Sequence, residues 1–116
     1  MMARGTRPRL TRRLMLEERA SLPDGAGGFA VSWRAVGTLW ADIAPRTGRE
    51  DFLAAQARSR MRHRIVVRGA PVGAPSRPRT DQRLREGDRI FNILTVTESD
   101  PAGRFLEIIA EEGVLP

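Results

Sequence analysis

The chain has 116 residues, the usual size of one domain, and folding at this length buries about two-thirds of the surface that the unfolded chain exposes. It contains no cysteine, which excludes disulfides, thiolate catalysis and cysteine-based zinc sites. The net charge is +6 and all 20 basic residues are arginine, so nucleic acid or an acidic protein is a reasonable neighbour. No apolar run is long enough for a membrane span or a signal peptide, so we expect a soluble protein that is not exported.

The charge is distributed unevenly along the chain. Residues 1–19 hold six arginines against two glutamates, and residues 46–68 hold seven arginines against two acidic residues. Residues 98–116 hold one arginine against five acidic residues. A chain that is basic early and acidic late predicts complementary surfaces for neighbouring molecules.

The first segment of the chain has almost nothing to bury. Residues 1–9 are rich in Arg, Gly and Pro, and we expect a flexible basic arm there, followed by one domain over residues 10–112 and a tail over 113–116. The stretch LTRRLMLEER from Leu10 fits either a helical turn or a strand. The strand is favoured because a cluster of turn-forming residues follows it.

Both tryptophans lie in the stretch GGFAVSWRAVGTLWADIAP. Phe29, Val31 and Trp33 alternate with small or polar residues, which predicts a half-buried strand whose aromatic side chains belong to the core. A second strand is expected over residues 38–44 and ends at Pro45, which has no N–H to donate.

Trp40 differs from Phe29 and Trp33, because it shares its face of this second strand with Thr38 and Asp42. A core position is favoured for Trp40. The alternatives are a cap over the open end of a barrel and an anchor in a subunit contact, where tryptophan is enriched.

A capping box at Thr47-Gly48-Arg49-Glu50 predicts a short helix over about 49–58. The strand that follows carries Arg60, Arg62, Arg64 and Arg68 on one face. These guanidinium groups would form a row of roughly 26 Å. The row is either a docking face for phosphates or carboxylates or an ordinary solvated face, with equal weight.

The remaining segments predict two hairpins. Residues 69–80 are rich in proline and glycine and predict a long loop, while residues 83–85, 89–96 and 105–110 predict strands separated by turns. The fold class is therefore mainly β: a small β-barrel of about six short antiparallel strands, with one short helix and the long loop over 69–80.

The composition argues against an enzyme. The only histidine, His63, lies on the apolar side of its strand, which predicts a buried or half-buried side chain with a local hydrogen bond, and not a ligand or a base. The chain has no nucleophile elbow and no phosphate-binding glycine loop, so we expect no catalytic residue, no cofactor and no metal.

The order of these features resembles the phage head–tail joining family, the small head-completion or stopper proteins of long-tailed phages and gene-transfer particles. The resemblance spans about residues 9–112 and rests on Asp24, Gly25, Gly27, Gly28, Phe29, Trp33, Trp40, Ala41, Ile43, Pro45, Gly48, Glu50, His63, Ile65, Arg68, Gly87, Phe91 and Ile93. Two departures stand out: Gly69, where the family tends to have an aromatic residue, and a longer loop over 71–80.

The resemblance implies a β-barrel that assembles in the bacterial host cytoplasm into a ring, expected to be a hexamer, within the particle. The ring would lie below the portal or adaptor, hold packaged double-stranded DNA without sequence preference, and present the docking surface for a tail terminator or tail tube, with no membrane partner. Candidates for the DNA-facing lumen are Arg46, Arg49, Arg58, Arg60 and Arg62, and the alternative is that arginines of the 71–80 loop line it. Candidates for subunit interfaces are Trp40, Arg64, Arg68, Glu111 and Glu112.

Two other functions are also compatible with the sequence. A free nucleic-acid-binding barrel of the OB or SH3-like kind would bind short DNA or RNA as an isolated monomer. A tail-tube or terminator subunit of the same particle would assemble into long tubes.

Overall fold

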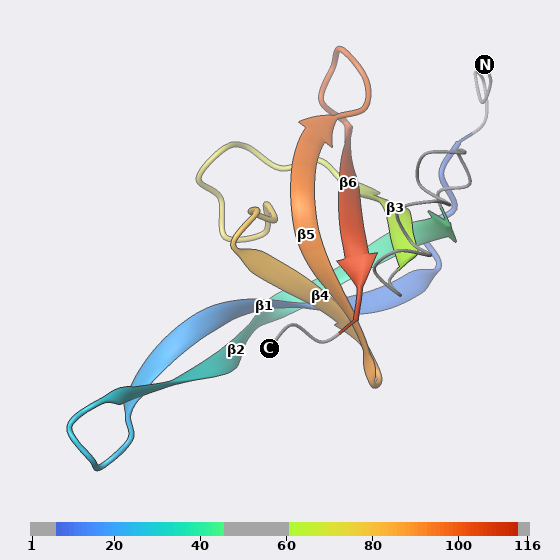
Figure 1. Cartoon of the computed structure of the whole chain (residues 1–116). Coiled ribbons are helices and arrows are strands. Elements are labelled where there is room, and N and C mark those ends of the chain that lie inside the picture. The colour runs from blue at the N-terminus through green and yellow to red at the C-terminus, as the bar shows by residue number, and fades with distance from the viewer. Residues whose placement is uncertain (1–6, 46–60, 114–116) are drawn as a thin grey trace.

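The computed structural model describes residues 7–45 and 61–113, and these form six antiparallel strands (Figure 1). The strands are β1 (Arg12–Pro23), β2 (Phe29–Pro45), β3 (Met61–Arg68), β4 (Gln82–Glu86), β5 (Arg89–Glu98) and β6 (Phe105–Glu112). They form a closed barrel in the order β1-β2-β3-β6-β5-β4, in which β4 pairs back onto β1. The predicted mainly β fold is confirmed. The helix predicted over 49–58 lies outside the described residues.

The barrel interior is built from alternate residues of every strand. The buried apolar side chains are Leu14, Leu16, Ala41, Ile65, Val67, Leu84, Phe91, Ile93, Leu106, Ile108 and Ala110. Burial of each large member of this set contributes about 1.5 to 3 kcal/mol. His63 is also buried, as predicted, with its ring edge-to-face against Phe91.

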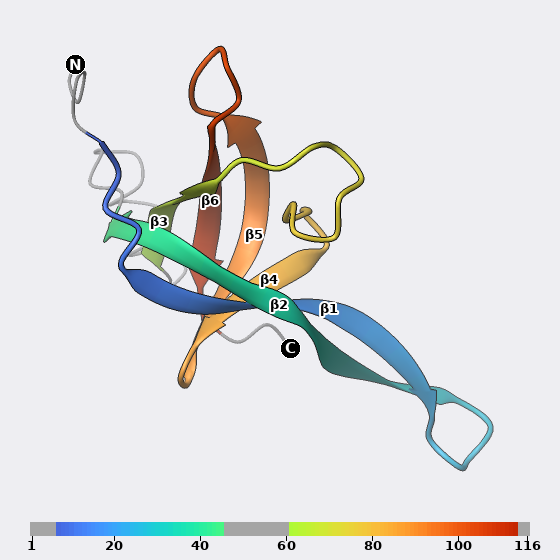
Figure 2. The same ribbon diagram turned by 180° about the vertical axis from the view of Figure 1, so that it is seen from behind.

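The hairpin of β1 and β2 is longer than the barrel and projects from it (Figures 1 and 2). β4 pairs with β1 only over Met15–Glu18, and β3 pairs with β2 only over Ala41–Pro45. Beyond these contacts the two strands continue as a two-stranded ribbon, which we call the arm (residues 19–34).

The tip of the arm is closed by the Asp-Gly-x-Gly-Gly-Phe motif. Asp24 Oδ1 accepts hydrogen bonds from the backbone N–H groups of Ala26 (2.8 Å) and Gly28 (3.0 Å). Gly25 and Gly27 have φ angles of 82° and 87°, a conformation that glycine adopts without strain. The motif that carries part of the family resemblance is therefore a hairpin closure.

The prediction that Phe29 and Trp33 belong to the core is wrong. Phe29 is 72% exposed and Val31 60% exposed, because the arm extends past the barrel and has no second layer against it. The alternating pattern is that of a two-faced strand, but it does not reveal whether another element covers the apolar face. The two strands expected between residues 29 and 44 are in fact one strand of 17 residues, with a register shift opposite Leu16 and Glu17.

The favoured core position of Trp40 is also wrong. Its side chain is 53% exposed, whereas the next residue, Ala41, is completely buried. Because neighbours along a strand point to opposite faces, Trp40 lies on the outer surface of the barrel.

The other predictions of secondary structure hold. The first segment is a strand, the two later hairpins form as expected, and the proline-rich segment before β4 has turns and no strand. Gly69, a departure from the family pattern, lies against the turn between β5 and β6. A Cβ atom there would be 2.0 Å from the carbonyl oxygen of Gly103, so no larger residue fits this position.

Candidate interaction surfaces

A row of five polar residues crosses the outer face of five strands in register. Its members, which we call the polar row, are Glu17, Arg83, Asn92, Glu111 and Arg62. Although this face is turned away from the core, Glu17, Asn92 and Glu111 are each at most 9% exposed. Arg83 Nε donates a 2.7 Å hydrogen bond to Glu17 Oε1, and Asn92 Nδ2 donates one of 2.7 Å to the carbonyl of Gly113. The polar row ties strands together within the chain.

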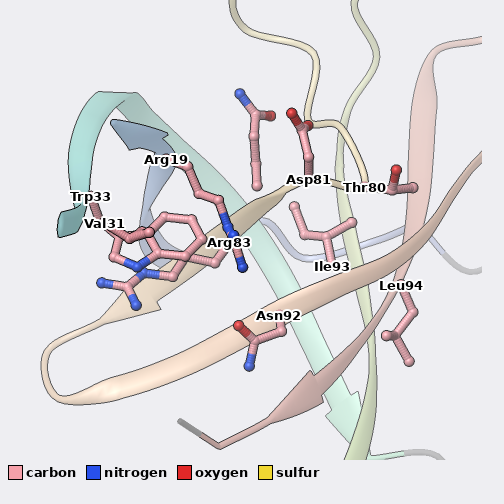
Figure 3. Close-up of a pocket in the computed structure, with 10 residues that line it drawn as sticks. Arg19, Val31, Trp33, Thr80, Asp81, Arg83, Asn92, Ile93 and Leu94 are labelled. Carbon is pink, nitrogen blue, oxygen red and sulfur yellow. The ribbon is translucent and has the colours of Figure 1, made fainter. Parts of the chain in front are cut away.

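Arg83 also joins the barrel to the arm. Its guanidinium carbon lies 4.1 Å from the centroid of the Trp33 ring, and that of Arg19 lies 5.5 Å from the same ring (Figure 3). Such cation–π contacts are worth about 0.5 to 2 kcal/mol, depending on desolvation. Trp33 is therefore fixed by arginines and not by the core.

The Trp33 contacts form one wall of a groove of about 590 Å³. The groove is lined by Arg19, Val31, Trp33, Thr80, Asp81, Gln82, Arg83, Asn92, Ile93 and Leu94. It combines apolar walls with hydrogen-bonding groups at the junction of arm, loop and barrel. The lining includes no histidine or cysteine, and the groove fits contact with another chain.

A second row on the outer face alternates arginine and aromatic residues across four strands. Arg13 on β1 is the register partner of Trp40 on β2, and Arg68 on β3 is the partner of Phe105 on β6. The β2–β3 ladder ends at Ala41 and Val67, so Trp40 and Arg68 are the next residues in register. We call Arg13, Trp40, Arg68 and Phe105 the basic–aromatic row. It brings together two of the predicted interface residues, Trp40 and Arg68.

The two rows differ in charge. The polar row contains its own carboxylates, whereas Arg13 and Arg68 are exposed and have no carboxylate within ion-pair distance among the described residues. The basic–aromatic row therefore presents positive charge beside an exposed indole.

The remaining interface candidates are engaged inside the chain. Arg64 pairs with Glu107, and Glu112 accepts hydrogen bonds of 2.8 and 3.0 Å from Arg89. The hydrogen bond from Arg89 lowers the pKa of Glu112. Glu111 is in the buried polar row. The acidic late segment expected from the sequence is largely neutralised by arginines of the same chain.

Of the candidate lumen residues, Arg62 lies half-buried in the polar row at the start of β3. Arg46, Arg49, Arg58 and Arg60 lie outside the described residues.

His63 combines burial with an incomplete set of partners. Its Nε2 lies 3.4 Å from Glu112 Oε1, and its buried Nδ1 has no hydrogen-bond partner among the described residues. Burial lowers the pKa of His63, although the nearby carboxylate of Glu112 acts in the opposite direction. The imidazole is therefore neutral at physiological pH.

The described residues lack a metal-binding cluster and a membrane-spanning helix. No group of three or more His, Cys, Asp or Glu side chains is placed to hold a metal ion within residues 7–45 and 61–113. In the same part of the chain no helix has the length and apolar character needed to cross a bilayer.

Sequence reasoning missed Arg13, Phe105, Arg19 and Arg83. The first two become part of a surface only through strand pairing across β1, β2, β3 and β6. The sequence carried a weak signal for this surface, namely an arginine without a nearby carboxylate at an outward position of β1 (Arg13) and of β3 (Arg68).

Comparisons with known proteins agree with this architecture. The family model described as phage head completion protein matches residues 6–113. A solved chain from the virion of a native gene transfer agent particle is 44% identical, with a TM-score of 0.70, and the match covers 95% of this chain and 100% of that chain. A search of curated proteins gave no match.

A second solved structure supports the fold alone. The solution structure of protein SF1141 from Shigella flexneri 2a has a TM-score of 0.67 at 21% identity, with 96% of this chain and 99% of that chain covered. Because the family match spans nearly all described residues, this chain belongs to the phage head completion protein family and is a structural protein of the virion with a head–tail role, not an enzyme.

Proposed function

We propose that this chain forms a ring, a hexamer, between the portal or adaptor of a filled head and the tail terminator or tail tube. The ring retains packaged double-stranded DNA and gives the tail its docking surface. The observation that carries this proposal is the arm, which projects from a closed barrel with Phe29 72% and Val31 60% exposed.

The arm supports assembly for a physical reason. Contiguous exposed apolar side chains are uncommon on monomers and usually mark an interaction site. Phe29, Val31 and Trp33 lie on the same face of the ribbon, because they are alternate residues of β2. If the arm of each subunit packs on the next subunit, the contact is heterologous, and such contacts close into rings when the rotation permits.

The arginine excess supports a channel for DNA. Arg46, Arg49, Arg58 and Arg60 are proposed to line the lumen, with Arg62 at the base of the same segment. Phosphate contacts from arginine position a duplex without reading its sequence, which suits a channel that holds any packaged DNA. The ring contact proposed above involves the arm and none of these arginines.

The proposal is tested in cells that make the particle, with the chain deleted and then restored. Without the chain we expect filled heads that lack tails and whose DNA becomes sensitive to nuclease. Restoration with Phe29→Ser and Val31→Ser should leave the same defect, whereas Val72→Ser, which changes a side chain 84% exposed in the loop, should restore the particle. Tailed particles with protected DNA in the absence of the chain would contradict the proposal.

Experiments on the purified protein distinguish the two alternative functions. A free nucleic-acid-binding barrel would bind a short DNA duplex tightly as a purified monomer, with strong salt dependence. A tail-tube subunit would form long tubes when purified. We expect neither, because we propose that the ring forms only on the neighbouring layer of the particle.

A further inference from the structure

We infer that the basic–aromatic row, together with the free edge of β2 beside it, binds an extended acidic segment of a different protein of the particle. The inference rests on the chain's place in the virion and does not depend on the ring or its stoichiometry.

The first step concerns the backbone of β2. From Phe29 to Trp40 the only strand partner of β2 among the described residues is β1, since β3 begins to pair at Ala41. The barrel is otherwise closed, so the outer edge of β2 is the longest row of unpaired backbone N–H and C=O groups in the described part. An exposed edge of this kind is a template for an added strand.

The edge also lacks the usual protection against pairing. Between Phe29 and Trp40 it carries no proline and a single charged residue, Arg34, which is paired with Glu18. Natural edges that stay free are commonly blunted by charges or proline. This edge therefore has the character of a binding surface.

The second step concerns charge. Arg13 and Arg68 flank the exposed Trp40 at the end of this edge, and both lack a carboxylate partner among the described residues. Arginine and tryptophan are the residue types most enriched among the energetic anchors of protein interfaces. A segment with carboxylates at alternate positions would pair with both guanidinium groups while its backbone extended the sheet.

Within residues 7–45 and 61–113, a second copy of this chain does not supply such a segment. Nearly every described carboxylate is already held by an arginine or a backbone amide of its own chain; Asp88, in the tight turn between β4 and β5, has neither. A residue in a two-residue turn cannot form an extended strand. The carboxylates of the described residues therefore favour another protein as the occupant.

Duplex DNA is disfavoured by the aromatic residues. Phosphate contacts need only the arginines, and the bases of a duplex are stacked inside the helix, where Trp40 and Phe105 cannot reach them. An indole that is half exposed between two arginines is better suited to the apolar stems and carboxylates of a peptide.

The inference is tested by photocrosslinking in the assembled particle. The crosslinking residue p-benzoylphenylalanine is placed at Thr38, an exposed outward position two residues from Trp40, and in a second strain at Trp40 itself. The control strain carries it at Val72, in the exposed loop. Purified particles are irradiated, and the crosslinked peptide is identified by mass spectrometry.

We expect the crosslinking residue at Thr38 and at Trp40 to react with one acidic segment of a different virion protein. The crosslinking residue at Val72 should not react with this segment. The change Arg68→Glu should reduce the yield at Thr38 at least about tenfold, and Arg79→Glu, in the loop, should not. Crosslinks to a second copy of this chain, crosslinks to DNA, or an absence of crosslinks at both row positions would each overturn the inference. If the chain itself is missing from the particles, the proposed function fails instead.

Discussion

The guanidinium of Arg83 holds two different partners at once: it stacks on the Trp33 ring at 4.1 Å from the centroid, and its Nε donates a 2.7 Å hydrogen bond to Glu17. The side chains of Arg83 and Glu17 are 13% and 9% exposed. A nearly buried ion pair therefore lies where the arm leaves the barrel.

Removal of one partner should be costly. We predict that Glu17→Ala lowers the free energy of unfolding by about 3 to 5 kcal/mol, because it leaves Arg83 charged and buried. The adjacent change Glu18→Ala removes a pair with Arg34, whose side chain is 69% exposed, and should cost less than about 1 kcal/mol. Urea unfolding of the two variants makes the comparison, and equal losses would show that the Glu17 pair is not effectively buried.

The two phenylalanines Phe29 and Phe91 allow a matched test of core and arm. We predict that Phe91→Ala costs about 3 to 5 kcal/mol, because Phe91 is completely buried in the barrel. Phe29→Ala should change monomer stability by no more than about 0.5 kcal/mol, because Phe29 is 72% exposed.

The same pair separates folding from assembly. The Phe29→Ala protein should be folded, as judged by its circular dichroism and urea midpoint, and yet enter particles poorly. Normal incorporation of this variant would remove the arm from the proposed ring contact.

The close contact between Gly69 and the Gly103 carbonyl explains why the aromatic residue of the family pattern is absent from position 69. We predict that Gly69→Ala costs about 1 to 3 kcal/mol, since the added Cβ would collide with the Gly103 carbonyl and separate the 2.7 Å hydrogen bond from Gly69 N–H to the Arg104 carbonyl. Gly37→Ala is the control, because a Cβ there meets nothing within 4 Å. Its effect should be neutral or stabilising by up to about 1 kcal/mol. A neutral Gly69→Ala variant would mean that the turn between β5 and β6 moves away freely.

His63 gives the protein a defined dependence on pH. Because burial lowers its pKa in the folded state, the unfolded chain binds more protons below its ordinary value, near 6.5. The free energy of unfolding is therefore highest above that pH and falls as the pH drops through it, until the lowered folded pKa is reached. We predict a loss of stability between pH 7 and pH 5 that His63→Leu abolishes. An unchanged slope in His63→Leu would assign the pH dependence to other groups.

Much of the barrel could be predicted from the sequence, but the surfaces could not. The hairpins around Gly87 and Gly103 and the buried His63 follow from local turn chemistry and alternation, which depend only on neighbouring residues. Trp33 and Trp40 show the same alternation and yet lie outside the core, because their surroundings are decided by how far β3 and β4 extend along the hairpin. Strand length and register are properties of the closed barrel.

The residues of the basic–aromatic row also depend on strand register, which the sequence alone does not reveal. The sequence indicated Arg68 and Trp40 as interface residues, but it gave no means of placing them next to Arg13, which is distant in the chain. It also indicated Glu111 and Glu112 as interface candidates, and it did not reveal that cross-strand pairing places both against groups of the same chain.

A cryo-EM reconstruction of the head–tail junction, in the particle that carries this chain, tests most directly whether this protein forms a ring there. We expect six copies between the portal or adaptor and the tail, with the arm of each subunit, including Phe29 and Val31, packed on the next. A reconstruction with the chain outside the junction, or with the arms uncovered by any neighbouring subunit, would contradict it.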